Sequence, residues 1–139
     1  MSNEEKKPQS AADLKGKSGI TRLINATRYS MQGFKAAFQN EDAFREEVLL
    51  AVVLIPAALL LPVGAVEKVL LIGSVLMLML TEILNTAVEA VVDRIGPELH
   101  PLSGRAKDLG SAAVFIATVL LIITWAFLAL PAVWTLIAG

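Results

Sequence analysis

Apolar residues dominate three stretches of this chain, and none of the three contains Asp, Glu, Lys or Arg: residues 48–66, 69–81 and 109–139. A helix of roughly 20 apolar residues is long enough to cross the hydrocarbon core of a bilayer, which is about 30 Å thick. The pattern therefore predicts an all-α integral membrane protein in which three helices cross the membrane.

We expect these helices to cover about residues 41–66, 69–93 and 104–137. The pair Glu67-Lys68 would form the first turn, and residues 94–103, interrupted by Gly96-Pro97 and Pro101, the second connection. Ser103 is the expected N-cap of the last helix. Two prolines, Pro56 and Pro62, lie near the far end of the first helix and are able to kink it or end it early.

Residues 20–39 follow a different pattern, in which apolar and polar positions alternate with the period of a helix. The polar positions include Arg22, Arg28 and Lys35 but no acid, which is typical of a helix lying in the membrane interface. An amphipathic helix packed on a neighbouring helix is the alternative. The sequence Asn40-Glu41-Asp42 resembles an N-cap with acidic residues after it, so we expect a new helix to begin there.

Residues 1–19 are polar and have no apolar period, so we expect a flexible tail before a single domain over 20–139. The tail holds Gly16-Lys17-Ser18, which matches the end of a phosphate-binding P-loop. That motif requires a glycine at the position of Ala11 and a preceding strand, and this sequence offers neither. We therefore do not predict a P-loop.

Composition supports the membrane assignment. Hydrophobic residues make up 55% of the 139 residues and charged residues only 18%, with a mean hydropathy of +0.65; soluble domains carry about 25% charged residues. A soluble fold of this size could not bury so much apolar surface. The formal net charge of −1 gives no indication of a nucleic-acid partner, and the absence of cysteine excludes disulfides.

The distribution of basic residues predicts the orientation in the membrane. Eight Lys or Arg residues precede Val48, and Arg94, Arg105 and Lys107 flank the second connection. The first connection has Lys68 alone, and the C-terminal region has no basic residue. We therefore expect the amino terminus and the second connection in the cytoplasm and the C-terminus on the other side, in the periplasm.

Four polar residues interrupt the second apolar helix: Glu82, Asn85, Glu89 and Asp93. At about 100° per residue, the last three fall roughly 60°, 20° and 20° from Glu82, so all four share one face. An acid at the centre of a membrane helix costs on the order of 2.5–3.5 kcal/mol and usually faces a polar site. Hydrogen bonding to neighbouring helices is the alternative for these residues. For Asp93, which lies at the cytoplasmic edge of the helix, we favour a solvated charge.

The depths of these acids suggest different roles. Glu82 lies about 10 Å deeper than Glu89 along the helix, where a lipid alcohol at the interface could reach it. A charged group from water could reach only Glu89 and the loop beyond, which supplies cations and oxygen ligands suited to phosphate and Mg²⁺. Glu41 has a depth comparable with Glu89, so the two carboxylates form a candidate Mg²⁺ site. The pattern indicates phosphate transfer from a soluble donor to a lipid alcohol.

Two other classes explain less of the pattern. A small proton- or ion-translocating subunit would use Glu82 as a proton carrier, but leaves Glu41, Glu89 and Lys107 without a role. A non-catalytic assembly or anchoring protein needs none of these residues.

The sequence EILNTAVEAVVDRIGPELHPLSGRAKDLGSAAV, residues 82–114, resembles the signature of the prokaryotic diacylglycerol kinase family. The similarity extends through residues 21–47, and the hydropathy matches from Thr21 to the end. The resemblance implies a homotrimeric enzyme of the bacterial inner membrane, with active sites shared between subunits. It would convert diacylglycerol to phosphatidic acid with ATP and Mg²⁺, in phospholipid recycling. Relatives of the same fold phosphorylate undecaprenol, which the acidic face alone cannot distinguish; the match over 82–114 favours diacylglycerol.

The same resemblance implies residue roles. Glu82 would be the general base, and Glu41 and Glu89 the metal ligands. The nucleotide site would comprise Arg22, Tyr29, Glu41, Asn85, Glu89, Glu98, Leu99, His100, Lys107 and Asp108. The lipid site would comprise Arg22, Ala26, Thr27, Arg28, Tyr29, Ser30, Met31, Lys35, Phe44, Glu47, Lys68, Glu82 and Ser111. At Leu99 this sequence departs from the aromatic residue of the best-known members, and Pro56 and Pro62 depart in a variable region.

Overall fold

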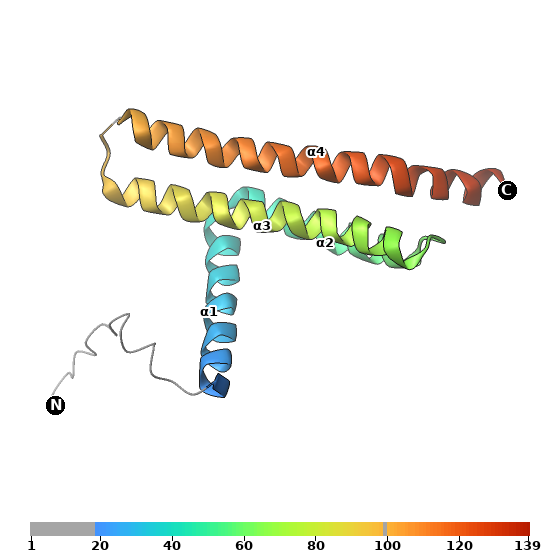
Figure 1. Ribbon diagram of the computed structural model, residues 1–139, viewed down its shortest axis with the longest axis horizontal. Coiled ribbons are helices and arrows are strands. Elements are labelled where there is room, and N and C mark those ends of the chain that lie inside the picture. Colours follow the sequence, from blue (N-terminus) through green and yellow to red (C-terminus); the bar gives the residue numbers. More distant parts are fainter. Residues whose placement is uncertain (1–18, 99) are drawn as a thin grey trace. The chain divides into compact units, whose positions relative to one another are not determined.

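The computed structural model describes residues 19–98 and 100–139 (Figure 1). They form four helices, namely α1 (Gly19–Asn40), α2 (Asp42–Leu60), α3 (Ala65–Ile95) and α4 (Pro101–Ala138), and this part of the chain contains no strand. The all-α prediction is therefore confirmed. Residues 1–18 of the expected flexible tail lie outside the described residues, as does Leu99.

The chain divides into two units after Ala36. The first contains α1 up to Ala36, with a helix that matches the prediction over 20–39. Its large apolar side chains remain accessible: Ile20, Leu23 and Met31 are each more than 60% exposed. Such a helix has an apolar face still to be covered, and a membrane interface is the environment that the sequence predicts for it.

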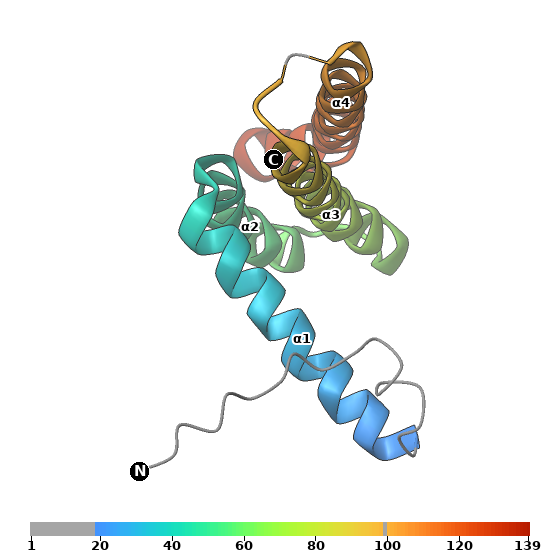
Figure 2. The same cartoon turned by 90° about the vertical axis from the view of Figure 1, so that its left-hand side faces the viewer.

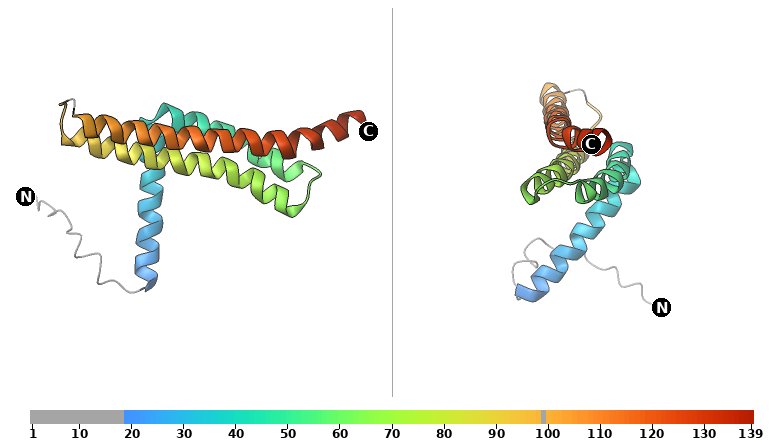
Figure 3. Two further views of the ribbon diagram at one scale, coloured as in Figure 1. Left: turned by 45° about the horizontal axis from the view of Figure 1, so that its top comes forward. Right: turned by 90° about the vertical axis from the view of Figure 1, so that its right-hand side faces the viewer.

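The second unit, residues 37–139, contains three antiparallel helices. Helix α3 packs against both α2 and α4. Figure 1 shows α3 and α4 running side by side along most of their length, and the end views in Figures 2 and 3 show α2 beside α3 as well. Two buried clusters join the three helices. One is formed by Ala51, Val75, Leu78, Ala117 and Leu121, the other by Ala58, Leu61, Leu71 and Ala129.

Alanines on α2 and α4 lie in these clusters, which allows the helix backbones to approach closely. Ala58 of α2 packs in the same cluster as Leu71 of α3, and Ala51 of α2 packs in the same cluster as Leu78 of α3. Between the two clusters α2 moves back by seven residues, and α3 moves forward by seven. The two helices are therefore in a constant antiparallel register. Trp125 on α4 adds a hydrogen bond from its indole Nε1 to the Leu71 carbonyl oxygen, at 3.3 Å.

The connection between α2 and α3 lies earlier in the chain than expected. Helix α2 continues through Pro56 but ends at Leu60, because Leu61, which precedes Pro62, adopts an extended conformation with ψ 140°. Helix α3 begins at Ala65, so Glu67 and Lys68 lie in its first turn and the prediction of a turn at these residues is wrong. Lys68 instead donates from Nζ to the Leu59 carbonyl oxygen, at 2.7 Å, at the end of α2.

The second connection is shorter than the predicted 94–103. Helix α3 ends at Gly96, whose φ of 148° is a backbone conformation that favours glycine. Helix α4 begins with Pro101, where the fixed φ of proline suits the first helical position. Its N-cap is His100, whose Nδ1 accepts a hydrogen bond from the Leu102 amide at 3.1 Å. The prediction that Ser103 is the cap is therefore wrong.

Two helices, α3 and α4, are long and apolar enough to cross a membrane. Helix α2 does not meet the same criterion, because four charged residues occupy its first two turns: Asp42, Arg45, Glu46 and Glu47. Large apolar side chains cover the outer surfaces, including Phe115, Phe127 and Ile137, each at least 70% exposed. An apolar exterior of this extent fits a lipid environment.

Candidate functional site

The polar face of α3 meets the first turns of α2. Ala51 of α2 and Leu78 of α3 lie in one cluster. Four residues earlier on α2 and four residues later on α3, the same antiparallel register places Glu47 opposite Glu82. The charges of Glu41 and Glu89 act on Glu82, and that of Glu82 acts on Glu47, so each of these three carboxylates lies within electrostatic range of Glu82. Glu82 is only 6% exposed. The structure therefore brings the predicted base, both predicted metal ligands and Glu47 together.

Several polar atoms in this region have unused hydrogen-bonding capacity. Among the described residues, Glu47 Oε2, Asn85 Oδ1 and Thr86 Oγ1 are buried and have no hydrogen-bond partner. Asn85 uses its other amide atom, Nδ2, to donate to Glu89 Oε1 at 3.3 Å. Folded proteins pair the great majority of their buried polar atoms. Three unpaired atoms beside a cluster of carboxylates therefore indicate a place where a ligand, ion or water completes the bonding.

Gly110 of α4 faces this cluster. A Cβ added at this position would collide with Asn85 Oδ1, so the absence of a side chain makes room for the amide. Gly110 is absent from the sequence-predicted site. A glycine within a predicted helix was the available signal, since such a residue often has a packing or functional reason.

A second group of site residues lies toward the connection between α3 and α4. Lys107 Nζ is 2.6 Å from Asp93 Oδ1, an ion pair that joins the two helices. Beside it is a cavity of about 390 Å³, lined by Val92, Asp93, Gly96, Glu98, His100, Pro101, Ser103, Gly104 and Lys107. The structure thus gathers Glu98, His100 and Lys107, which were predicted for the nucleotide site. Asp93 pairs with Lys107 rather than being only a solvated charge.

Other predicted residues lie away from these two groups. Asp108 and Ser111 are exposed on α4, and neither lines the cavity. Phe44 of α2 is only 2% exposed, so it packs inside the helical unit. Lys68 is 14 residues from Glu82 on α3, or about 21 Å along the helix. It caps the end of α2 instead.

The remaining predicted residues lie on α1, in the first unit. The hydroxyl of Thr27 donates to the Leu23 carbonyl oxygen and that of Ser30 to the Ala26 carbonyl oxygen, each at 3.0 Å. The guanidinium of Arg28 lies 5.4 Å from the centre of the Tyr29 ring, a cation–π contact. The other predicted residues of this helix are Arg22, Met31 and Lys35, all exposed.

The donor set fits one kind of metal site. Within residues 19–98 and 100–139 no group of three or more His, Asp or Glu side chains is arranged to hold a metal ion. Mg²⁺ is commonly bound through one or two carboxylates together with substrate phosphates and water. Glu41 and Glu89, both half-buried and close to Glu82, fit that mode of binding rather than a closed protein cage.

The arrangement separates two environments. Glu82 is a buried carboxylate on the lipid-crossing part of α3, whereas the Lys107 cavity opens at the end of the same helix. Glu89 lies between them, hydrogen-bonded to Asn85 and close enough to act on Lys107. Such a site can accept an apolar alcohol and a charged phosphate donor from opposite directions.

Comparison with known proteins agrees with this chemistry. The family described as "Prokaryotic diacylglycerol kinase" matches residues 28–129. A diacylglycerol kinase of Haemophilus influenzae is 57% identical over 108 residues, which cover 78% of this chain and 92% of that protein. One from Escherichia coli is 58% identical over 114 residues, covering 80% and 91%. One from Pseudomonas aeruginosa is 52% identical over 117 residues, covering 84% and 95%.

Proposed function

Because this chain belongs to the prokaryotic diacylglycerol kinase family, we propose that it transfers the γ-phosphate of ATP to the primary hydroxyl of diacylglycerol, forming phosphatidic acid. The observation that carries the proposal is the position of Glu82. It is buried on a membrane-crossing helix and lies within the electrostatic influence of Glu41 and Glu89, and Glu89 also acts on Lys107 beside the cavity. The catalytic carboxylate thus lies between a lipid environment and an aqueous one.

Glu82 acts as the general base. A primary hydroxyl is a poor nucleophile, so its proton must be removed as it attacks the phosphate. The lipid oxygen forms a bond to the γ-phosphorus while the bond from that phosphorus to the bridging oxygen breaks, and ADP leaves. The proton passes to the Glu82 carboxylate.

The nucleotide occupies the cavity beside Lys107, with Glu98 and His100 along its wall. The Lys107 ammonium offsets the charge of the triphosphate. Glu41 and Glu89 would hold Mg²⁺, which would supply positive charge to offset that of the triphosphate. Asn85 orients Glu89 through its amide hydrogen bond, and its Oδ1 packs against Gly110 of α4.

Helix α2 forms a third membrane crossing in this proposal. It has 19 residues, equivalent to about 28 Å of helix, and carries no charge after Glu47. It also packs antiparallel to α3, so its charged first turns lie toward the polar end of α3 (Figure 1). Together with the basic residues before Val48, this supports a cytoplasmic amino terminus and a periplasmic C-terminus in the inner membrane.

The active form is a homotrimer whose sites are completed between subunits. Large apolar side chains on the outer faces of α3 and α4, such as Leu76, Phe115 and Ile116, give the helices surface for neighbouring copies as well as for lipid. The exposed positions of Asp108 and Ser111 are compatible with roles toward a neighbouring subunit. Crosslinking in the membrane would test the subunit number.

The decisive experiment offers two alcohols to the purified protein in mixed micelles with labelled ATP and Mg²⁺. We expect labelled phosphatidic acid from diacylglycerol and little product from undecaprenol. A preference for undecaprenol would replace the proposed substrate while leaving the chemistry intact. ATP-independent proton or ion flux in proteoliposomes, without phosphate transfer, would overturn the kinase proposal.

A further inference from the structure

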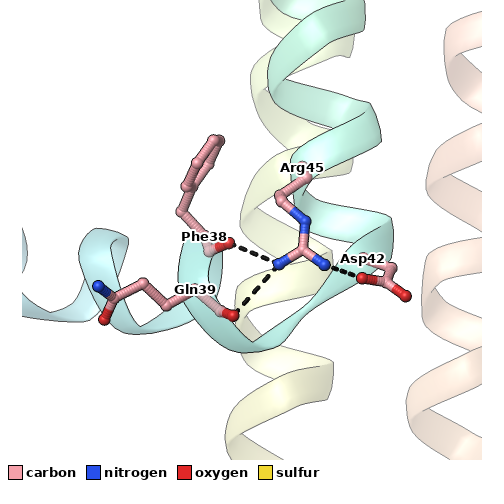
Figure 4. A network of polar contacts seen from close by, with 4 residues as sticks. All are labelled: Phe38, Gln39, Asp42 and Arg45. Atoms are coloured by element: carbon pink, nitrogen blue, oxygen red, sulfur yellow. Dashed lines mark hydrogen bonds and ion pairs between the residues drawn. The ribbon is translucent and has the colours of Figure 1, made fainter.

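Arg45 makes a three-way contact at the junction of α1 and α2. Its Nη1 donates to the carbonyl oxygens of Phe38 and Gln39, at 2.9 and 3.2 Å. Its Nη2 pairs with the Asp42 carboxylate. Figure 4 shows the guanidinium between the two carbonyls on one side and Asp42 on the other. All four residues belong to the second unit, residues 37–139.

This contact has a clear local role. The last carbonyls of a helix lack partners within it and must be satisfied by other donors. Arg45 satisfies two of them at the end of α1 and also binds the first residue of α2. Both terminal nitrogens of its guanidinium are therefore engaged, which distinguishes Arg45 from a side chain available for phosphate binding.

Glu41 is the single non-helical residue at this junction. It has extended backbone angles, φ −117° and ψ 116°, and its side chain makes no capping hydrogen bond to α2. Its amide donates to the Ala37 carbonyl oxygen at 2.9 Å, and its carbonyl oxygen accepts from the Arg45 amide at 3.2 Å. The direction of the Glu41 carboxylate therefore depends on the backbone before and after Glu41. Arg45 binds that backbone at Phe38 and Gln39 and the side chain of Asp42.

The position of that carboxylate matters for the site, because its charge acts on Glu82. A metal ligand on a single extended residue has more freedom than one on a helix such as Glu89. Groups that hold metal ligands in place commonly change metal affinity 10–100-fold when they are removed.

We propose that Arg45 is a positioning residue for Mg²⁺ binding: by joining Phe38, Gln39 and Asp42, it fixes the backbone of Glu41 and directs its carboxylate toward Glu89. This inference rests on the proposed function, in which Glu41 and Glu89 hold the metal. It assigns a role in metal affinity to a residue outside the predicted nucleotide and lipid sites.

Mn²⁺ provides a readout that does not depend on turnover. Electron paramagnetic resonance measures free and bound Mn²⁺ with the full-length protein in micelles and a non-hydrolysable ATP analogue. We expect Arg45→Gln to weaken Mn²⁺ binding about tenfold, and to raise the half-saturating Mg²⁺ concentration of the kinase reaction by a similar factor. Turnover at saturating Mg²⁺ should fall much less.

Three further variants separate positioning from simple destabilisation. Arg45→Lys keeps one charged donor and should recover part of the Mn²⁺ affinity. Asp42→Asn leaves both carbonyl bonds of Arg45 in place and should have a smaller effect than Arg45→Gln. Arg94→Gln, at an exposed arginine in the last turn of α3, is the matched control and should not change Mn²⁺ binding.

A double-mutant cycle with Glu41→Gln gives the sharpest result. If Arg45 acts through Glu41, Arg45→Gln should cause no further loss of Mn²⁺ affinity in the Glu41→Gln background. Additive losses, or a thermally destabilised Arg45→Gln with normal Mn²⁺ affinity, would overturn the inference. Should Arg45→Gln fail to fold, Arg45→Lys and Asp42→Asn enter the same cycle. Failure of the wild type to phosphorylate diacylglycerol would instead overturn the proposed function.

Discussion

At the end of the helices where α2 joins α3, polar side chains donate hydrogen bonds to main-chain carbonyl oxygens. Ser74 and Trp125 both donate to the Leu71 carbonyl oxygen, at 2.8 and 3.3 Å, and Lys68 donates to that of Leu59. At the opposite end of the same helices, three buried polar atoms of the described residues have no partner, and carboxylates lie close together. The first end has its polar groups paired, which stabilises the fold, whereas the second end leaves polar groups unpaired at the proposed active site.

A protein of 139 residues can contain both a well-paired end and an end with unpaired polar groups, because packing at the first offsets the cost of the second. Buried unpaired polar atoms cost about 1–3 kcal/mol each, and neighbouring carboxylates repel one another. The alanine-lined packing of Ala58, Leu71 and Ala129 is one contribution that offsets this cost. Substitutions at the end with the carboxylates should therefore lower activity more than stability. Substitutions at the end where α2 joins α3 should lower stability more than activity.

The largest expected effect is that of Glu82→Gln. Removing the base should lower turnover by roughly 10²–10⁴-fold, the usual contribution of general base catalysis. Nucleotide binding should persist, because Glu82 lies deeper than the Lys107 cavity. Stability should be unchanged or higher, since a buried charge is replaced by a neutral amide.

Kinase assays, nucleotide titration and thermal unfolding measure these three quantities. Glu46→Gln, at an exposed acid one residue from Glu47 on α2, serves as the control. Equal loss of turnover and nucleotide binding in Glu82→Gln would contradict the assignment of Glu82 as the base.

The next effect is that of Glu89→Gln. The amide retains an acceptor for the Asn85 hydrogen bond but loses the charge that binds a cation. We expect a rise of about tenfold or more in the half-saturating Mg²⁺ concentration. A Mg²⁺ titration of the kinase reaction identical to that of the wild type would count against the ligand role.

A smaller effect is expected for Gly110→Ala. The added Cβ would displace the Asn85 amide and disturb its bond to Glu89, lowering turnover roughly tenfold. Gly73→Ala is a suitable comparison, because a Cβ at Gly73 meets nothing within 4 Å. That control should retain activity and gain up to about 1 kcal/mol of helix stability. Equal activity in both variants would remove Gly110 from the site.

The smallest effect is expected for Lys68→Gln. The loss of the bond to the Leu59 carbonyl oxygen should lower stability by about 0.3–1 kcal/mol, the usual value of a cation at a helix C-terminus. The KM for diacylglycerol should not change, because Lys68 lies at the stable end. A higher KM with unaltered unfolding would instead support the lipid-binding role that the resemblance implies for Lys68.

The sequence was sufficient to predict the acidic face of α3. Regular helical geometry places Glu82, Asn85 and Glu89 on one side, and an acid among apolar residues has few explanations other than function. The comparable depth of Glu41 and Glu89 was predicted from the position of Glu41 at the start of the first apolar segment. These inferences depend only on local periodicity, which the sequence contains directly.

Contacts between helices could not be predicted in the same way. The fit of Asn85 against Gly110 depends on the register of α3 and α4, and the Arg45 contact on the path of the backbone through Glu41. The misplaced helix ends have a similar cause. Pro62 acts through the residue before it, and His100 takes the capping role because Pro101 already suits the first position of the helix.

The capping role of His100 has a consequence for the cavity beside it. Its Nδ1 is occupied by the Leu102 amide at 3.1 Å, so that ring nitrogen is the unprotonated one. The bond leaves Nε2 as the ring nitrogen that carries hydrogen, on a residue that lines the cavity. Main-chain geometry at the start of α4 thereby determines which ring nitrogen of His100 is free to donate.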